Sequence, residues 1–249
     1  MGQEFSVFFN IIHRKYKWTG MGQKGWGTVG LSDLLAVRRG ITALIGSGGK
    51  TTAMYLLAEE LSHRGTVICT TSTHILPPAH MPVLTAADEA AERLSRQGVV
   101  CMGSPGPEGK LIAPPVSAAD MADLADYVLV EADGSRQLPC KAHLPHEPVV
   151  PPDTDQRILL VGASGFGQPV CRGAHRPDVF CRLSGLEPDD PITPQALAAI
   201  ICQENLADKV LINQAEAPQA LALARELAAL LPVPAFAGSL RKRSFLCLL

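Results

Sequence analysis

The sequence predicts a three-layer α/β fold built around a mainly parallel sheet. Short apolar runs alternate with helical segments over most of the 249 residues, and a glycine-rich turn joins the first apolar run to the first long helix. Apolar residues make up 47% of the chain, which is ample for one buried core. We therefore expect a single domain over residues 31–249, preceded by a flexible, glycine-rich arm over residues 1–30.

The first predicted elements form a βαβ unit. A short helix over Leu31–Arg38, capped by Ser32, precedes a strand over Ile41–Ile45. The helix that follows the glycine-rich turn ends at Gly65, and the strand Thr66–Thr70 comes next. The segment between these two strands is long enough for a right-handed crossover, which places the strands parallel in one sheet.

The rest of the chain continues the alternation of helices and strands. Ser117 and Asp120 stand at the capping-box positions of one further helix. Glycine and proline predict a turn or hairpin over 104–115, and prolines exclude regular structure over 137–152. The other expected helices cover 86–96, 117–124, 193–204 and 219–231, and the other expected strands cover 99–102, 127–130, 157–161 and 210–213.

Composition excludes several classes of protein. The formal net charge is -2 and the basic residues form no long stripe, so we expect no nucleic-acid partner. No apolar run is long enough to cross a bilayer, and the apolar segment Phe5–Ile12 precedes its basic residues, the reverse of a secretory signal. Seven cysteines without a C-x-x-C pair fit reduced thiols. We expect a cytoplasmic protein without a membrane partner.

A phosphate-binding loop is predicted between the first strand and the first long helix. Three glycines remove the Cβ atoms that would keep backbone N–H groups away from a polyphosphate, and the helix that begins near Lys50 directs its positive end at the anion. Lys50 can reach the β- and γ-phosphates, and the Thr51 hydroxyl falls where such loops hold Mg²⁺. The loop is Gly46, Ser47, Gly48, Gly49, Lys50, Thr51 and Thr52.

The loop departs from the common P-loop pattern at one position. Leu44 stands where that pattern has another glycine, so the loop has the shorter G-x-x-G-K-T-T form that resembles the ATP loop of Mur-type ligases. We therefore expect a P-loop NTPase-like domain that binds Mg²⁺ with ATP or GTP. The alternative is an ordinary glycine turn with an exposed lysine.

A second apolar strand ends in two acidic residues. In YVLVEADGS, Glu131 and Asp133 point to the same side by strand alternation, and the carboxyl edge of a parallel sheet is where ligands bind. One carboxylate can hold Mg²⁺, for which we select Asp133 together with Thr51, while the other orients or deprotonates a nucleophile. Lys50, Glu131 and Asp133 are the predicted catalytic residues. A strand-end turn that merely favours acidic residues is the alternative.

Further polar residues follow other predicted strands and are candidates for binding a second, anionic substrate. A metal site at Cys140, His143 and His146 is disfavoured, because no second pair of ligands stands at metal-binding spacing. The substrate candidates are Thr73, His74, Ser135, Arg136, Lys141, His175 and Arg176. Plain turn chemistry remains the alternative for Thr73 and His74, and a surface turn for His175 and Arg176.

The segment VLINQAE has the position of the base-recognition segment N-K-x-D of GTPases. Gln214 and Glu216 replace the usual Lys and Asp, while Asn213 keeps the amide that can bond a base edge. The choice between adenine and guanine stays open.

These segments together resemble the YqeC family, named as accessory proteins for selenium-dependent molybdenum hydroxylases. The matching pieces are GSGGKTT, TTSTHI, EADGSRQLPCKAHLPHEPVVP, GASGFGQPV with HRPDV, and INQAE. The resemblance implies a cytosolic P-loop protein that helps to mature or insert a selenium-containing molybdenum cofactor. Its partners would be a molybdenum hydroxylase or a cofactor-maturation protein, and a small-molecule acceptor. Lys50, Thr51, Glu131, Asp133, Ser135 and Arg136 fall in the family's motifs.

The chain also departs from this family at several positions. They include Gln137, Cys140 and His143, on the substrate side of the predicted site, and the tail after Ser239 fits poorly, so that the last strand is expected to lack support. We expect a Mg²⁺-dependent NTPase or phosphotransferase. The alternatives are a nucleotide-gated chaperone or carrier with little catalysis, and a small-molecule kinase or Mur-like ligase.

Overall fold

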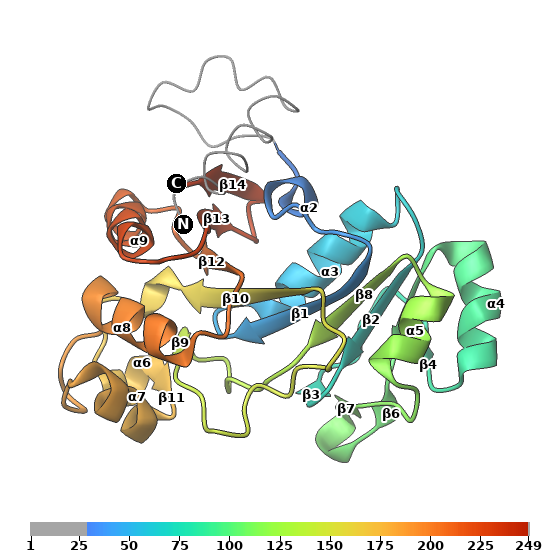
Figure 1. The fold of residues 1–249 in the computed structure, drawn as a ribbon, viewed down its shortest axis with the longest axis horizontal. Helices are drawn as coiled ribbons and strands as arrows, with labels where there is room; N and C mark the ends of the chain where they lie inside the picture. The colour runs from blue at the N-terminus through green and yellow to red at the C-terminus, as the bar shows by residue number, and fades with distance from the viewer. Residues whose placement is uncertain (1–28, 249) are drawn as a thin grey trace.

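The computed structural model describes residues 29–248 as a mixed α/β fold with helices on both faces of a nine-stranded sheet (Figure 1). The strand order is β14-β13-β12-β10-β1-β8-β2-β5-β4, and every neighbouring pair is parallel except β13 with β14. The predicted α/β class with a mainly parallel sheet is confirmed. Most of the arm predicted over residues 1–30 lies outside the described residues.

The central strand of the sheet is β1 (Gly40–Gly46), which lies between β8 (Tyr127–Glu131) and β10 (Gln156–Gly162). Both faces of these strands are covered, so they consist of nearly continuous apolar residues. The other strands are β2 (Val67–Thr71), β4 (Val83–Leu84), β5 (Val99–Met102), β12 (Lys209–Asn213), β13 (Ala235–Ser239) and β14 (Ser244–Cys247).

Helices cover the two faces of the sheet through alternate residues of its strands. In β1, Leu44 packs with α2 (Leu31–Leu34) and α3 (Lys50–Leu61), whereas Ala43 packs on the opposite face. That opposite face is covered by α4 (Ala87–Gln97), α5 (Ala118–Leu124), α8 (Pro194–Glu204) and α9 (Pro218–Ala229). The capping box predicted at Ser117 and Asp120 is present.

Short elements lie at the carboxyl edge of the sheet and beyond it. The predicted hairpin is confirmed by the antiparallel pair β6 (Ser104–Pro105) and β7 (Leu111–Ile112), and β7 also pairs with β3 (His74–Ile75). Within the segment expected to be irregular, β9 (Cys140–Lys141) pairs with β11 (Ala174–His175). The helices α6 (Val170–Gly173) and α7 (Pro177–Ser184) were not predicted, and each begins at or directly after a proline.

Two expectations at the ends of the domain were wrong. Ser32 does not cap a helix over 31–38, because α2 spans only four residues and the amides of Leu31 and Ser32 donate to the Glu60 carboxylate at 2.9 and 2.7 Å. The tail after Ser239 is not unsupported, because β14 pairs with β13. Between residues 29 and 248, no helix is both long and apolar enough to cross a membrane.

Candidate functional site

The carboxyl ends of β1 and β8 lie side by side in the sheet, and the glycine-rich turn Gly46–Gly49 leads from β1 into α3. Gly46, Gly48 and Gly49 have φ of +85°, +80° and +123°. A Cβ on Gly48 would lie 2.3 Å from the Gly162 amide nitrogen, and one on Gly46 would lie 2.5 Å from the Leu160 carbonyl oxygen. Glycine is therefore required for this turn to pass over the end of β10.

Lys50 begins α3 and turns its side chain back into the site, where only 4% of the residue is exposed. Its Nζ donates to the Gly46 carbonyl at 2.6 Å and lies 3.0 Å from Asp133 Oδ1. Weaker contacts reach Ser135 Oγ at 3.4 Å and Glu131 Oε1 at 3.9 Å. Lys50 therefore joins the turn to both acidic residues at the end of β8, which point to the same side as predicted.

Asp133 is fully buried and is surrounded by positive groups. Its Oδ2 accepts hydrogen bonds from the Gly46 amide and from His143 Nε2, both at 2.8 Å, and lies 3.2 Å from Lys141 Nζ. Burial acts to raise the pKa of Asp133, but the His143 hydrogen bond and the two lysine charges outweigh it and lower the pKa to about 2. Oδ1, which faces Lys50, has no hydrogen-bond partner.

Glu131 lies in a different environment from Asp133. Its Oε2 accepts a 2.7 Å hydrogen bond from the Thr51 hydroxyl. Burial raises the pKa of Glu131 above its ordinary value, although Lys50 and Thr51 oppose this effect. The environments therefore push the two pKa values apart, which is a common property of carboxylates that divide acid and base roles.

A second group of charged residues adjoins Asp133. Lys141 Nζ donates to the Gly134 carbonyl at 2.7 Å and lies 3.2 Å from Glu147 Oε2, while Arg176 donates to Glu147 Oε1 at 2.9 Å. Burial acts to raise the pKa of Glu147, but Arg176 and Lys141 lower it to about 2. Lys141 therefore contacts both carboxylates and links Asp133 to Glu147.

His175 is buried beside this network. Burial, followed by the charges of Lys141 and Arg176, lowers the pKa of His175 from 6.5 to about 4. His175 thus binds a proton at a higher pH in the unfolded chain than in the folded protein. Its contribution to stability is fully present above about pH 6.5 and is lost as the pH drops toward 4.

We expect His175→Gln to flatten the dependence of unfolding free energy on pH between 6.5 and 4. The wild-type protein should lose up to about 3 kcal/mol over this range from His175, at roughly 1.4 kcal/mol per pKa unit. Urea unfolding at a series of pH values measures the change. His80→Gln, at an exposed histidine, is the control. A slope as steep in His175→Gln as in wild type would contradict the assigned pKa.

The structure does not bring all the predicted site residues together. Thr73 closes a local turn, in which its amide donates to Thr71 Oγ1 at 2.9 Å. His74 and Thr52 are exposed, and Arg136 is exposed with a φ of +49°. None of these four makes a hydrogen bond or ion pair with Lys50, Glu131 or Asp133 within the described chain.

Asn213, the predicted contact for a base, bonds the glycine-rich turn in this structure. Its Nδ2 donates to the Gly48 carbonyl at 2.7 Å, and its Oδ1 accepts from the Leu240 amide at 2.9 Å. The side chain is buried and ties the glycine-rich turn to the residue that follows β13.

Sequence reasoning missed two residues that contact the site. His143 was considered as a contact for an anionic substrate or as a metal ligand, and Glu204 was seen only as the end of a helix. Among residues 29–248, no cluster of three or more His, Cys, Asp or Glu side chains is arranged to hold a metal ion. His143 instead contacts Asp133 and Glu204. Glu204 lies 61 residues after His143, and no spacing in the sequence indicates this pairing.

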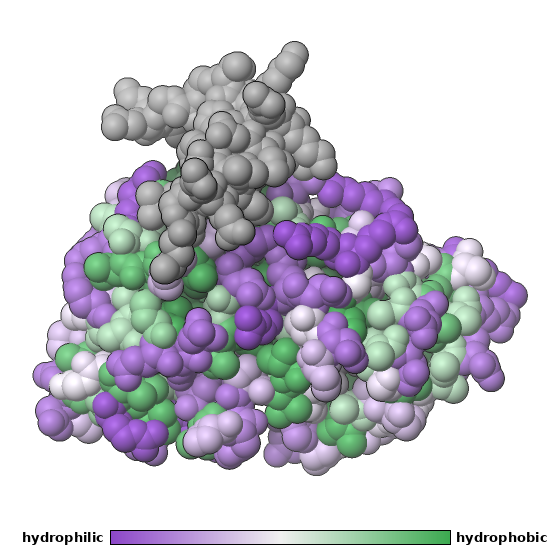
Figure 2. Space-filling model, in the orientation of Figure 1, coloured by the Kyte–Doolittle hydropathy of each residue, from purple (hydrophilic) through white to green (hydrophobic). Residues whose placement is uncertain are grey.

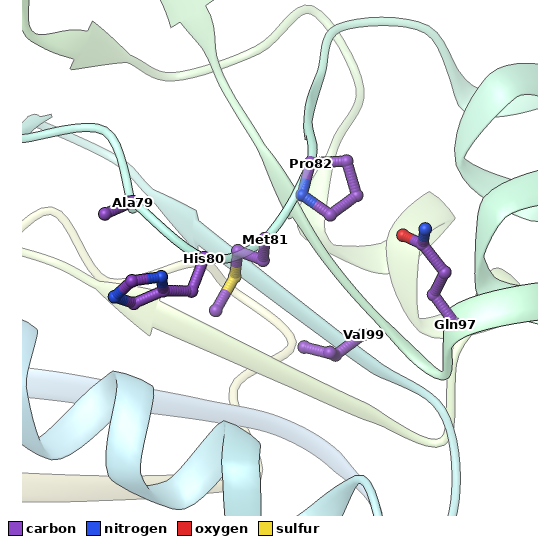
Figure 3. Close-up of a pocket in the computed structure, with 6 residues that line it drawn as sticks. All are labelled: Ala79, His80, Met81, Pro82, Gln97 and Val99. Atoms are coloured by element: carbon purple, nitrogen blue, oxygen red, sulfur yellow. The ribbon is translucent and has the colours of Figure 1, made fainter.

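The surface outside this site offers a cavity of about 520 Å³ near one edge of the sheet (Figure 3). It is lined by Ala79, His80, Met81, Pro82, Gln97 and Val99, none of which was predicted to bind a ligand. Figure 2 shows hydrophilic and hydrophobic residues interspersed over one face of the molecule. Because the cavity lining contains one titratable side chain, His80, the buried charges around Lys50 are a stronger candidate for chemistry.

Comparisons with known proteins match the part of the chain that contains this site. A family model described as YqeC protein matches residues 42–178. The Uncharacterized protein YqeC of Escherichia coli (strain K12) is 33% identical over 180 residues, which cover 68% of this chain and 70% of that protein. Lys50, Glu131 and Asp133 all lie within the residues that the family model matches.

Proposed function

The chain belongs to the YqeC family, and we propose that it binds a nucleoside triphosphate with Mg²⁺ to support maturation or insertion of a selenium-containing molybdenum cofactor of hydroxylases. The observation that carries the nucleotide proposal is the convergence of Lys50 with Glu131 and Asp133 at the end of a glycine-rich turn. A strand, a glycine-rich turn, a lysine and a helix in this order are the pattern of a phosphate-binding loop of the P-loop NTPase-like kind, which supports the proposal.

The residues present fit a Mg²⁺ ion. Asp133 Oδ1 is buried without a hydrogen bond and has an ion-pair contact with Lys50 at 3.0 Å. The Thr51 hydroxyl donates to Glu131, which Lys50 also contacts. Mg²⁺ prefers oxygen ligands and usually binds through one or two protein groups together with phosphates and waters, so a larger protein cage is not needed. When bound, the ion would neutralise charge on the β- and γ-phosphates.

Each protein group has a different proposed role. Lys50 would stabilise the phosphate charge, and Asp133 would hold the cation directly or through water. Glu131, whose pKa is raised, orients the nucleophile or accepts its proton. Ser135, Arg136, His175 and Arg176 are proposed contacts of an anionic small-molecule acceptor, with Thr73 and His74 at the neighbouring strand end.

A nucleotide-gated carrier with little catalysis is favoured by one observation. Lys50 is bonded to the Gly46 carbonyl and paired with Asp133, so its amino group must leave protein partners before it can bind phosphate. A partner, such as a molybdenum hydroxylase or a cofactor-maturation protein, could promote that exchange. We propose the cytoplasm as the compartment, since all seven cysteines are free thiols.

The first experiment is calorimetric titration of the purified protein with ATP and with GTP, each in excess Mg²⁺. We expect saturable 1:1 binding of one nucleotide, with affinity that falls when EDTA removes the ion. Phosphate release is then measured with and without the partner proteins. Turnover by the protein alone supports an NTPase or phosphotransferase, and turnover only with a partner supports the carrier. Failure to bind either nucleotide would contradict the proposal.

A further inference from the structure

The geometry points to His143 and Glu204 as positioning residues that fix the Asp133 carboxylate for the divalent cation of the nucleotide complex. This inference rests on the proposed function, because it assigns a role to two residues through Asp133. Neither residue makes a hydrogen bond or ion pair with Lys50 or the glycine-rich turn. Their effect on the site therefore has to pass through the Asp133 side chain.

His143 is held at three points. Its backbone amide donates to Glu204 Oε1 at 2.6 Å, its Nδ1 lies 2.7 Å from Glu204 Oε2, and its Nε2 lies 2.8 Å from Asp133 Oδ2. The imidazole is nearly inaccessible, with 3% of its side chain exposed. One carboxylate at the end of α8 therefore sets both the backbone and the ring of His143.

The two carboxylates determine how the His143 ring is oriented. Both ring nitrogens face carboxylate oxygens, which only accept hydrogen bonds when ionised. The ring lies between the two carboxylates. Glu204 fixes its Nδ1 side, and Nε2 then faces Asp133 Oδ2.

The consequence for Asp133 is that its two oxygens are unequal. Oδ2 is engaged by the Gly46 amide, His143 and Lys141, whereas Oδ1 has only the ion-pair contact with Lys50. The carboxylate thus stays fixed through Oδ2 when Lys50 moves toward a phosphate. Oδ1 is left as the oxygen that can face a cation.

The test measures the divalent-ion dependence of nucleotide binding, using the nucleotide that the wild-type protein prefers. Outer partners of metal-binding carboxylates and histidines typically change metal affinity by about 10- to 100-fold. We expect His143→Ala to raise the Mg²⁺ concentration for half-maximal binding by about 10-fold or more, while binding in EDTA changes by less than about twofold. Glu204→Gln should shift the midpoint in the same direction by a smaller factor.

Conservative and matched variants separate this role from simple destabilisation. His143→Gln keeps an amide N–H that can reach Asp133, so its midpoint should fall between those of wild type and His143→Ala. Glu226→Gln alters a carboxylate on α9 that bonds Gln195 and should leave the midpoint unchanged. Binding of Mn²⁺ to the nucleotide complex, followed by electron paramagnetic resonance, gives a second reading of the same affinity.

Two negative outcomes are distinguishable. If wild type binds nucleotide but folded His143→Ala, His143→Gln and Glu204→Gln all keep its Mg²⁺ midpoint, the positioning role is overturned and the nucleotide proposal stands. If wild type binds neither ATP nor GTP, the proposed function fails and the positioning role fails with it. Circular dichroism identifies any variant that does not fold, and the remaining two then decide the result.

Discussion

Lys50→Ala is expected to abolish nucleotide binding. The Lys50 amino group is the buried cation at the helix end of the glycine-rich turn, and it donates to the carbonyl of Gly46, the first residue of that turn. We expect the dissociation constant to rise by at least about 100-fold, or roughly 2.7 kcal/mol. Calorimetry with ATP and GTP in excess Mg²⁺ measures this change directly.

Two companion variants are needed, because removal of Lys50 also deprives Asp133 of a partner. Lys50→Arg keeps the positive charge but replaces a compact ammonium with a planar fork, so binding should remain weak in a folded protein. Lys110→Ala, at an exposed lysine paired with Glu108, should bind as wild type does. Wild-type affinity in folded Lys50→Ala would exclude the phosphate-binding loop.

The central sheet could be predicted from the sequence because its strands are buried on both faces. The strands β1, β8 and β10 were each located to within one residue at either end, since a fully buried parallel strand appears as a continuous apolar run. The same argument placed Glu131 and Asp133 at the edge where Lys50 lies. Topology brings these residues together without any detail of side-chain packing.

Contacts between distant segments could not be predicted in this way. His143 lies in a proline-rich segment without a period, and its partner Glu204 ends a helix 61 residues later. Asn213 has the sequence context of a base contact, but its amide bonds to Gly48 and Leu240. The helix α7 was missed because the segment at its start, His175-Arg176-Pro177, was interpreted as a substrate contact or a surface turn, although proline often begins a helix.

Asp133→Ala is expected to cause the largest loss of stability of any substitution in the site. The carboxylate lies within 3.2 Å of Lys50, Lys141 and His143, and none of its side chain is exposed. Removing one partner from a buried charge network leaves the others uncompensated, which typically costs about 3–5 kcal/mol. Urea unfolding at pH 7 should show a loss of this size. Asp208→Asn, at a half-exposed aspartate paired with Arg157, should cost about 1 kcal/mol or less.

The pH dependence of stability provides an independent check on Asp133. Its pKa of about 2 in the folded protein lies below the ordinary value of 3.8, so its contribution is complete above about pH 3.8 and is lost as the pH falls toward 2. That contribution is on the order of 2 kcal/mol, at roughly 1.4 kcal/mol per pKa unit. Asp133→Asn keeps an acceptor for the Gly46 amide but cannot ionise, so its stability should fall less steeply over this range. If the stability of Asp133→Asn falls with pH as steeply as that of wild type, the Asp133 carboxylate does not stabilise the buried cations. Asp133 could then not be the central residue of the site.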